Sequence, residues 1–132
     1  MNVSLNVTGL DSLIRGFGQA PSVLSEETYK ALDASLDMIQ AEAQRRTPVD
    51  TGRLKASIGN QSRGGWRWIR GLTASLGTYV YYALWVELRN TRHAIGQSHY
   101  MEDGAKAAIP QIIRFFEQAM ERVAARTTKT LP

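Results

Sequence analysis

The sequence predicts an α+β domain in which a long N-terminal helix and a C-terminal helix pack on a mainly antiparallel sheet, with one long loop. Apolar residues recur every three or four positions over residues 21–46 and again after residue 102, as in amphipathic helices. Between them, apolar and polar residues alternate as in strands with one buried face. With 132 residues, 43% of them hydrophobic, the chain suits a single domain covering residues 1–132.

A strand and then a long helix are expected in the N-terminal third. The strand is predicted by the alternation of Val3, Leu5 and Val7 with polar residues, and a short helical stretch over residues 10–17 should follow. The long helix should run from Pro21, which suits a first turn, to about Arg46, a length of about 39 Å at ~1.5 Å per residue. Its apolar stripe consists of Tyr29, Leu32, Leu36, Ile39 and Ala43.

A structural turn is predicted directly after this helix. Proline disfavours the α region for the residue before it, so the helix should end ahead of Pro48. Asp50 and Thr51 can bond their own backbone, and Gly52 can adopt a positive φ that would cost other residues roughly 1 to 2 kcal/mol. Arg53 completes the turn motif, after which the chain should enter the sheet.

The middle of the chain is expected to form an antiparallel meander. Its segments are separated by turns rich in Ser, Gly and Thr. The expected strands are residues 54–58 with Leu54, Ala56 and Ile58 inward, a strand with Trp66 and Trp68, a strand with Leu72, Ala74 and Leu76, and residues 79–82.

The last third should contain a long loop and a helix. Residues 88–100 show neither helical nor strand periodicity, and we expect this loop to be mobile in the free subunit and ordered by neighbours. The final helix should begin near Glu102, where Glu102 and Asp103 complement its dipole. Its apolar stripe consists of Ile109, Ile112, Phe116, Met120 and Val123.

Composition narrows the class of protein. There are no cysteines, which excludes disulfides and thiolate zinc sites. The longest apolar run, residues 79–86, is far shorter than the roughly 20 residues that span a bilayer, so no membrane partner is expected. Residues 45–92 contain nine Lys or Arg and two acidic residues, whereas the rest of the chain contains seven and ten. This basic middle favours an acidic partner surface or nearby nucleic acid, or is a solvated sheet face.

The turn motif also has a resemblance. The run Thr47-Pro48-Val49-Asp50-Thr51-Gly52-Arg53-Leu54 closely resembles the helix-to-sheet junction of the gene-product-ten-like family of lambdoid siphophages, minor tail components involved in tail completion and head-tail joining. Further points of similarity are Gly9-Leu10, Leu76-Gly77-Thr78, Tyr82-Ala83 and Val86-Glu87. Many relatives follow the glutamate with a residue, Gly and Thr, whereas Leu88-Arg89-Asn90-Thr91 stands here.

The resemblance implies a structural virion protein of a tailed phage or prophage, located in the tail or neck and assembled in the bacterial cytoplasm. It implies a homo-oligomeric ring, with a hexamer as the first expectation, at the neck-proximal end of the tail. The implied partners are neighbouring tail tube, terminator or head connector proteins. DNA would pass through the lumen without sequence-specific contact, and no enzymatic activity or cofactor is implied.

Two chemical alternatives were weighed against this interpretation. Asp50-Thr51-Gly52 is also the tripeptide of aspartic proteases, but those enzymes are nearly all β and follow it with a small residue, whereas Arg53 follows here. His93 and His99, with Glu102 and Asp103 beyond them, lack the spacing of common metal-ligand pairs, so no metal site is predicted.

The candidate interface combines aromatic and basic residues: Trp66, Arg67, Trp68, Arg89 and Arg92. Trp and Arg are favoured in subunit interfaces, and the same types can stack on bases and contact phosphates in a DNA-binding or DNA-guiding module. Ordinary packing of the tryptophans in the sheet is the third interpretation. If the helices cover one sheet face, the tryptophans on the other would form an exposed patch.

Overall fold

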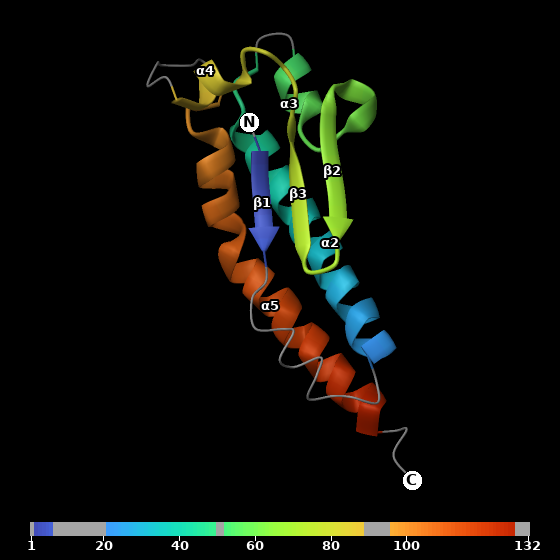
Figure 1. Ribbon diagram of the computed structural model, residues 1–132. Coiled ribbons are helices and arrows are strands. Elements are labelled where there is room, and N and C mark those ends of the chain that lie inside the picture. Colours follow the sequence, from blue (N-terminus) through green and yellow to red (C-terminus); the bar gives the residue numbers. More distant parts are fainter. Residues whose placement is uncertain (1, 7–20, 50–51, 89–95, 129–132) are drawn as a thin grey trace.

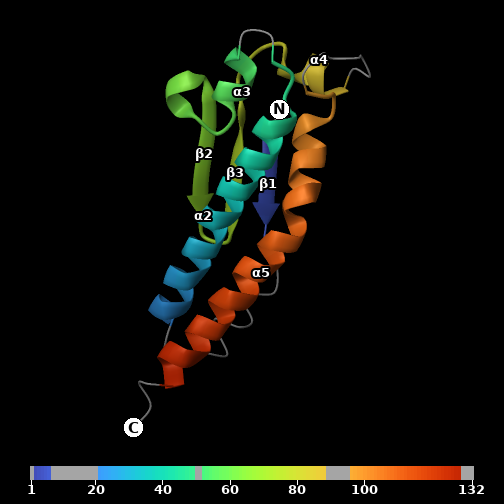
Figure 2. The ribbon, with the colours of Figure 1, turned by 180° about the vertical axis from the view of Figure 1, so that it is seen from behind.

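A computed structural model describes residues 2–6, 21–49, 52–88 and 96–128. A three-stranded antiparallel sheet forms one layer, and the long helices α2 and α5 cover one of its faces (Figure 1). Viewed from behind, α2 and α5 run in opposite directions side by side (Figure 2). This confirms the predicted α+β architecture.

Helix α2 spans Pro21–Arg46, with the predicted start and end. Four of the five predicted stripe residues are buried, namely Leu32, Leu36, Ile39 and Ala43. The prediction for Tyr29 is wrong, because 56% of this residue is exposed. The buried stripe runs through Leu24, Thr28 and Leu32 instead, which leaves Tyr29 on its flank.

The sheet consists of β1 (Asn2–Asn6), β2 (Gly65–Arg70) and β3 (Thr73–Thr78), in the order β1-β3-β2. The predicted first strand is therefore confirmed for Asn2–Asn6, and the predicted hairpin is confirmed, although Leu72 lies in the turn and not in a strand. Val7 and the helical stretch predicted over residues 10–17 lie outside the described residues. Ala74 and Leu76 of the central strand are buried in the core that the helices share. Since successive strand residues point to opposite faces, Ser75 and Gly77 belong to the face without helices.

Residues 54–58 were expected to be a strand, and this is wrong. The chain forms the short helix α3, Arg53–Ser57, in which Ala56 N–H donates to the Gly52 carbonyl at 3.0 Å. Leu54 and Ile58 are four residues apart and both buried, so they fit a helical turn as well as a strand. Over five residues the two periodicities cannot be separated, and tertiary packing decides. A short 3-10 helix, η1 (Gln61–Arg63), then leads into β2.

Residues 79–82 were also expected to be a strand, and this too is wrong. β3 ends at Thr78, whose hydroxyl accepts a hydrogen bond from the Val80 N–H at 3.1 Å. A turn at residues 81–82 leads into helix α4, Ala83–Leu88. Val80 and Ala83 are the buried residues here, at the three-residue spacing of a turn and not at the spacing of a strand.

Helix α5 spans Tyr100–Thr128, two residues longer at its start than predicted. Ile112 and Val123 of the predicted stripe are buried, and Phe116 and Met120 are partly buried. The prediction for Ile109 is wrong, because 50% of this residue is exposed. The rest of the buried face combines the large side chains of Tyr100 and Met101 at the helix start with small residues further along, namely Gly104, Ala108 and Ala119.

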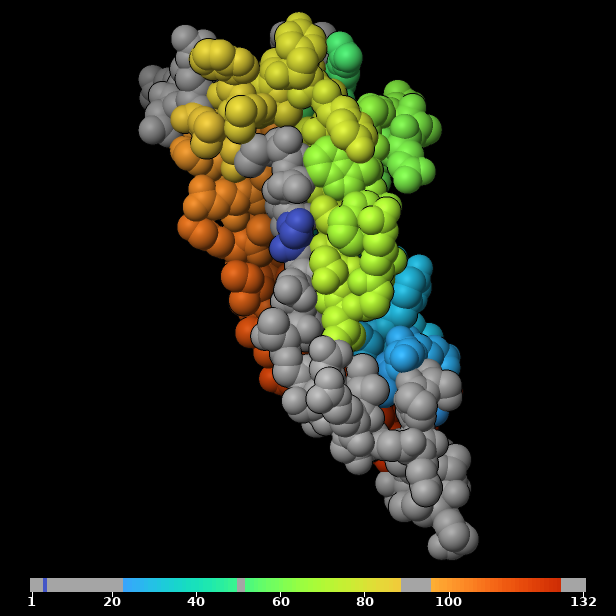
Figure 3. Space-filling model, viewed as in Figure 1, coloured from blue at the N-terminus to red at the C-terminus, as the bar shows by residue number. Residues whose placement is uncertain are grey.

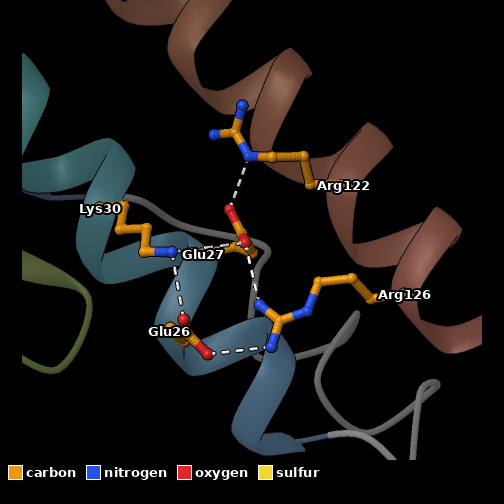
Figure 4. A network of polar contacts seen from close by, with 5 residues as sticks. All are labelled: Glu26, Glu27, Lys30, Arg122 and Arg126. Carbon is orange, nitrogen blue, oxygen red and sulfur yellow. Dashed lines mark hydrogen bonds and ion pairs between the residues drawn. The ribbon is translucent and has the colours of Figure 1, made fainter.

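The helices are longer than the sheet that they cover. Strands of six residues extend for about 20 Å, whereas the 26 residues of α2 extend for about 39 Å. Beyond the strands, a polar network connects the start of α2 with the end of α5 (Figure 4). Glu27, only 2% exposed, accepts from Arg122 Nε at 2.7 Å and from Arg126 Nη1 at 3.0 Å. The hydrogen bond from Arg122 holds the pKa of Glu27 below its usual value, although burial acts in the opposite direction.

We expect Glu27→Gln to lower the free energy of unfolding at pH 7 by about 1 to 2 kcal/mol, because charge-assisted hydrogen bonds to a buried acceptor are lost while the half-exposed arginines regain water. Because the pKa of Glu27 is lower in the folded state than the usual 4.5, its carboxylate stabilises the fold at pH values above 4.5. This stabilisation is lost as the pH falls from 4.5 through the pKa that Glu27 has in the folded state. Urea unfolding should therefore show a difference that shrinks below pH 4.5. Glu121→Gln, at an exposed position of α5, is the control; an equal effect of both changes would contradict the role of Glu27.

Candidate interaction surfaces

The helix-free face of the sheet carries both tryptophans of the candidate interface. Trp66 donates its indole N–H to Ser75 at 3.2 Å and its ring lies 4.7 Å from the ring of Tyr79. The guanidinium of Arg70 lies 4.5 Å from the ring centre of Trp68. Figure 3 shows this face, where the side chains of β2 and β3 form a continuous surface. Both tryptophans are partly buried, so they contribute to packing and also remain accessible.

Arg67 lies on the other face of β2. Its guanidinium contacts Asp33 at 2.6 Å and Asp37 at 2.7 Å, both on α2, and also donates to Gln40 at 3.1 Å. The side chain therefore connects the sheet to a helix. The structure does not bring Arg67 to the same face as the tryptophans, and Arg89 and Arg92 lie outside the described residues.

The predicted turn motif is described in part. Gly52 has a φ of +79°, as expected, and a Cβ there would have open space around it, so a larger residue would meet backbone strain without a steric clash. Pro48 is partly buried and Arg53 is exposed at the start of α3. Asp50 and Thr51 lie outside the described residues.

The end of the long loop is attached to this junction. Gln97 N–H donates to the Arg46 carbonyl at 2.8 Å, and a Cβ at Gly96 would lie 2.5 Å from the Pro48 nitrogen. Only glycine therefore fits at position 96. The expected mobility of the loop remains a prediction for residues 89–95, which are outside the described residues.

The N-terminus of α5 is capped by a glutamate distant in sequence. The two carboxylate oxygens of Glu87, a residue only 1% exposed, accept from Met101 N–H at 2.9 Å and Glu102 N–H at 3.0 Å. Next to it, the buried hydroxyl of Tyr100 donates to the Ala83 carbonyl at 3.0 Å, and burial raises the pKa of this hydroxyl. The Glu87 position noted in the sequence is thus a structural cap that fixes α4 against α5.

Three potential metal ligands, Glu87, His99 and Glu102, lie within 4.8 Å of one another. Spacing along the sequence did not reveal this group, because Glu87 comes from α4. Its present bonds are structural: Glu87 caps α5, and Glu102 contacts Lys106 at 3.0 Å and His99 Nδ1 at 3.4 Å. His93 lies outside the described residues.

Five exposed apolar residues gather at the α4 end of the molecule. They are Tyr79 (74% exposed), Tyr81 (82%), Leu84 (52%), Trp85 (64%) and Leu88 (60%). We call these five residues the α4-end surface. Figure 3 shows it adjoining the helix-free face of the sheet. Monomeric proteins seldom expose such a patch unless another molecule binds it. The sequence prediction missed this surface because it assigned residues 79–82 to a strand of the sheet.

Exposed apolar surfaces of this kind are typical of proteins that bind other molecules. Comparison with protein families identifies the family: residues 11–104 match the family model described as "Bacteriophage HK97-gp10, putative tail-component". Since the match covers more than half of the chain, the protein belongs to this family of phage tail components, as the resemblance in the sequence implied. No match was found among curated proteins or solved structures. In the described residues, no helix has the length and hydrophobicity needed to cross a membrane.

We expect Glu87→Ala to reduce the free energy of unfolding by about 1 to 3 kcal/mol, because the buried Met101 N–H and the partly buried Glu102 N–H would lose their acceptor. Glu87→Gln should have a smaller effect, since the amide keeps one acceptor oxygen. Chemical denaturation measures both. Glu102→Gln removes an exposed carboxylate from the same turn and should change stability by less than 0.5 kcal/mol, the usual range at the surface. A larger loss for Glu102→Gln than for Glu87→Ala would refute the capping role.

Proposed function

We propose that this protein completes the tail of a phage or prophage, or joins the tail to the head, by forming a homo-oligomeric ring at the neck-proximal end. Family membership supports a structural role in the tail. The observation that carries the finer proposal is the α4-end surface, because five apolar side chains that are each more than half exposed are of the kind that a binding partner usually covers. A hexamer is the expected stoichiometry.

Two kinds of contact are needed in such an assembly, and the chain offers two adjoining surfaces for them, which meet where the ring of Trp66 lies 4.7 Å from that of Tyr79. Contacts between subunits of the ring would use the β2 side, with Trp66 and Trp68. Contacts with the next component would use the α4-end surface, whose partner is a tail tube, terminator or head connector protein. The partner surface should be apolar, because the exposed residues of the α4-end surface are apolar or aromatic and Glu87, the one acidic residue among residues 79–88, is buried.

A DNA-guiding role is the second candidate, and one observation favours it. Residues 51–86 contain five Lys or Arg and no acidic residue. Arg67 is paired with α2 and Arg70 stacks on Trp68, but Lys55 and Arg63 are exposed. DNA in the lumen would meet such a surface without sequence-specific contacts. Tight DNA binding whose affinity falls steeply with salt concentration would favour a dedicated DNA-binding function over the guiding of DNA through the lumen.

An aspartic protease is not supported. The family to which the chain belongs is one of structural tail components, and its match includes Asp50-Thr51-Gly52. Asp50→Asn should therefore keep the fold and assembly, because an amide oxygen can still accept the turn bond.

The ring interface can be tested with the change Trp66→Ser, Trp68→Ser. Each tryptophan carries ~150 to 250 Å² of buriable area, of which the accessible part would be covered in the ring. We expect a folded subunit that has lost at least tenfold in self-association and no longer completes tails. Light scattering measures the mass, and a thermal transition checks the fold. If the variant lacks a cooperative transition, the tryptophans are core residues and this interface is wrong.

The docking surface can be tested separately with Leu84→Ser, Trp85→Ser. Both residues are more than half exposed, so we expect stability and ring formation to persist. Completion of tails in an extract that lacks the protein should fall at least tenfold, measured as infectious particles. Ala107→Ser, at an exposed position of α5 where the change should also leave the fold stable, is the matched control. Full activity of the α4-end variant would exclude this surface as the docking site.

A further inference from the structure

A second exposed apolar feature lies on α5. Ile109 and Ile113 are 50% and 53% exposed, one helical turn apart, while Ala108 and Ile112 of the same helix are buried. Arg114 is exposed next to them. We call Ile109, Ile113 and Arg114 the α5 ridge. The nearby cations are Lys106 and Arg114, and the exposed Glu117 follows about one turn after Ile113. Lys106 is engaged by Glu102, at 3.0 Å.

A groove lies on the other side of the molecule, between α2 and the edge strand β2. Its apolar and aromatic lining comes from Tyr29, Trp68 and Ile69, and its polar lining includes Asp33, Gln40 and Arg67. Tyr29 is 56% exposed, which is unexplained by packing within the subunit. We call this the β2 groove.

The charge of the groove complements that of the ridge. Two carboxylates, Asp33 and Asp37, share the single guanidinium of Arg67, and their side chains are 49% and 67% exposed. One negative charge is therefore left over at the groove. The ridge carries the exposed guanidinium of Arg114 beside two isoleucines that are one turn apart, which is the spacing of anchors on a helix that binds in a groove.

The two surfaces lie on opposite sides of the subunit. In Figure 1 the first half of α5 forms one side of the molecule and β2 the other, and Figure 2 shows the same separation from behind. A ring requires this arrangement, because each subunit must use one surface toward the previous subunit and a different surface toward the next.

We infer that the α5 ridge of one subunit binds in the β2 groove of a second copy of this chain, so that the ring closes through head-to-tail contacts. This inference rests on the proposed function and names its contact. Ile109 and Ile113 pack against Tyr29 and Trp68 of the neighbour, and Arg114 pairs with Asp37. The α4-end surface stays uncovered by this contact and remains available to the next component.

The test uses two variants of the full chain. The ridge variant, Ile109→Ser, Ile113→Ser, keeps the groove; the groove variant, Tyr29→Ser, Asp37→Arg, keeps the ridge. All four positions are at least half exposed, so both variants should fold. Each alone should be monomeric at concentrations at which the wild type forms rings. Mixed in equal amounts they should form a one-to-one dimer and nothing larger, because only one productive contact is possible.

Mass photometry or analytical ultracentrifugation distinguishes the outcomes. Leu84→Ser, at an equally exposed apolar position outside both surfaces, is the matched control and should form normal rings. Wild-type rings together with normal rings of either variant would overturn the head-to-tail contact while leaving the ring intact. Absence of a mixed dimer, when the wild type forms rings, would also overturn it, since an intact ridge would then fail to bind an intact groove. A wild-type chain that is monomeric at all concentrations would overturn the proposed ring itself.

Discussion

The close approach of α2 and α5 is the constraint on which the rest of the structure depends. A Cβ at Gly104 would lie 2.7 Å from the Cα of Ala43, so the two backbones meet at a point where only glycine fits. Glycine within a helix costs about 1 kcal/mol relative to alanine. The cost is offset because the contact lets Leu36, Ile39 and Ala108 form one core with the sheet. Beyond the sheet, Glu27 and its arginines keep the same two helices together.

The capping of α5 follows from this arrangement and determines where the exposed residues lie. Because α5 must begin beside the end of α2, its first N–H groups become buried, and Glu87 supplies their acceptor. Placing Glu87 there fixes α4, in which Ala83 is buried and Val86 packs on the core while Leu84, Trp85 and Leu88 face outward. Stability and the proposed docking surface are therefore coupled through one short helix. The exposure of the apolar residues at this end therefore follows from the way in which α4 caps α5.

The sequence was sufficient for elements with strong local signals. Pro21 and Pro48 bracket α2, and the glycine of the turn has the predicted positive φ at Gly52. Short segments were predicted less well: Leu54, Ala56 and Ile58 fit either periodicity, and packing selected the helix α3. The candidate site was predicted only in part. Trp66 and Trp68 lie on the helix-free face, but Arg67, between them in the strand, points to the other face and pairs with Asp33 and Asp37 of α2. The sequence did not reveal this pairing, because the partners are remote in sequence. The α5 ridge was missed because Ile109 was assigned to the core.

The central claim is that this tail component works as a closed ring built from identical head-to-tail contacts. Electron microscopy of the purified wild-type chain tests it most directly. We expect closed rings of uniform size in which α5 of each subunit faces β2 of the next, with the α4 ends all on one side of the ring. Particles that remain monomeric, or two-fold symmetric dimers in which the same surface of both subunits is buried, would contradict it.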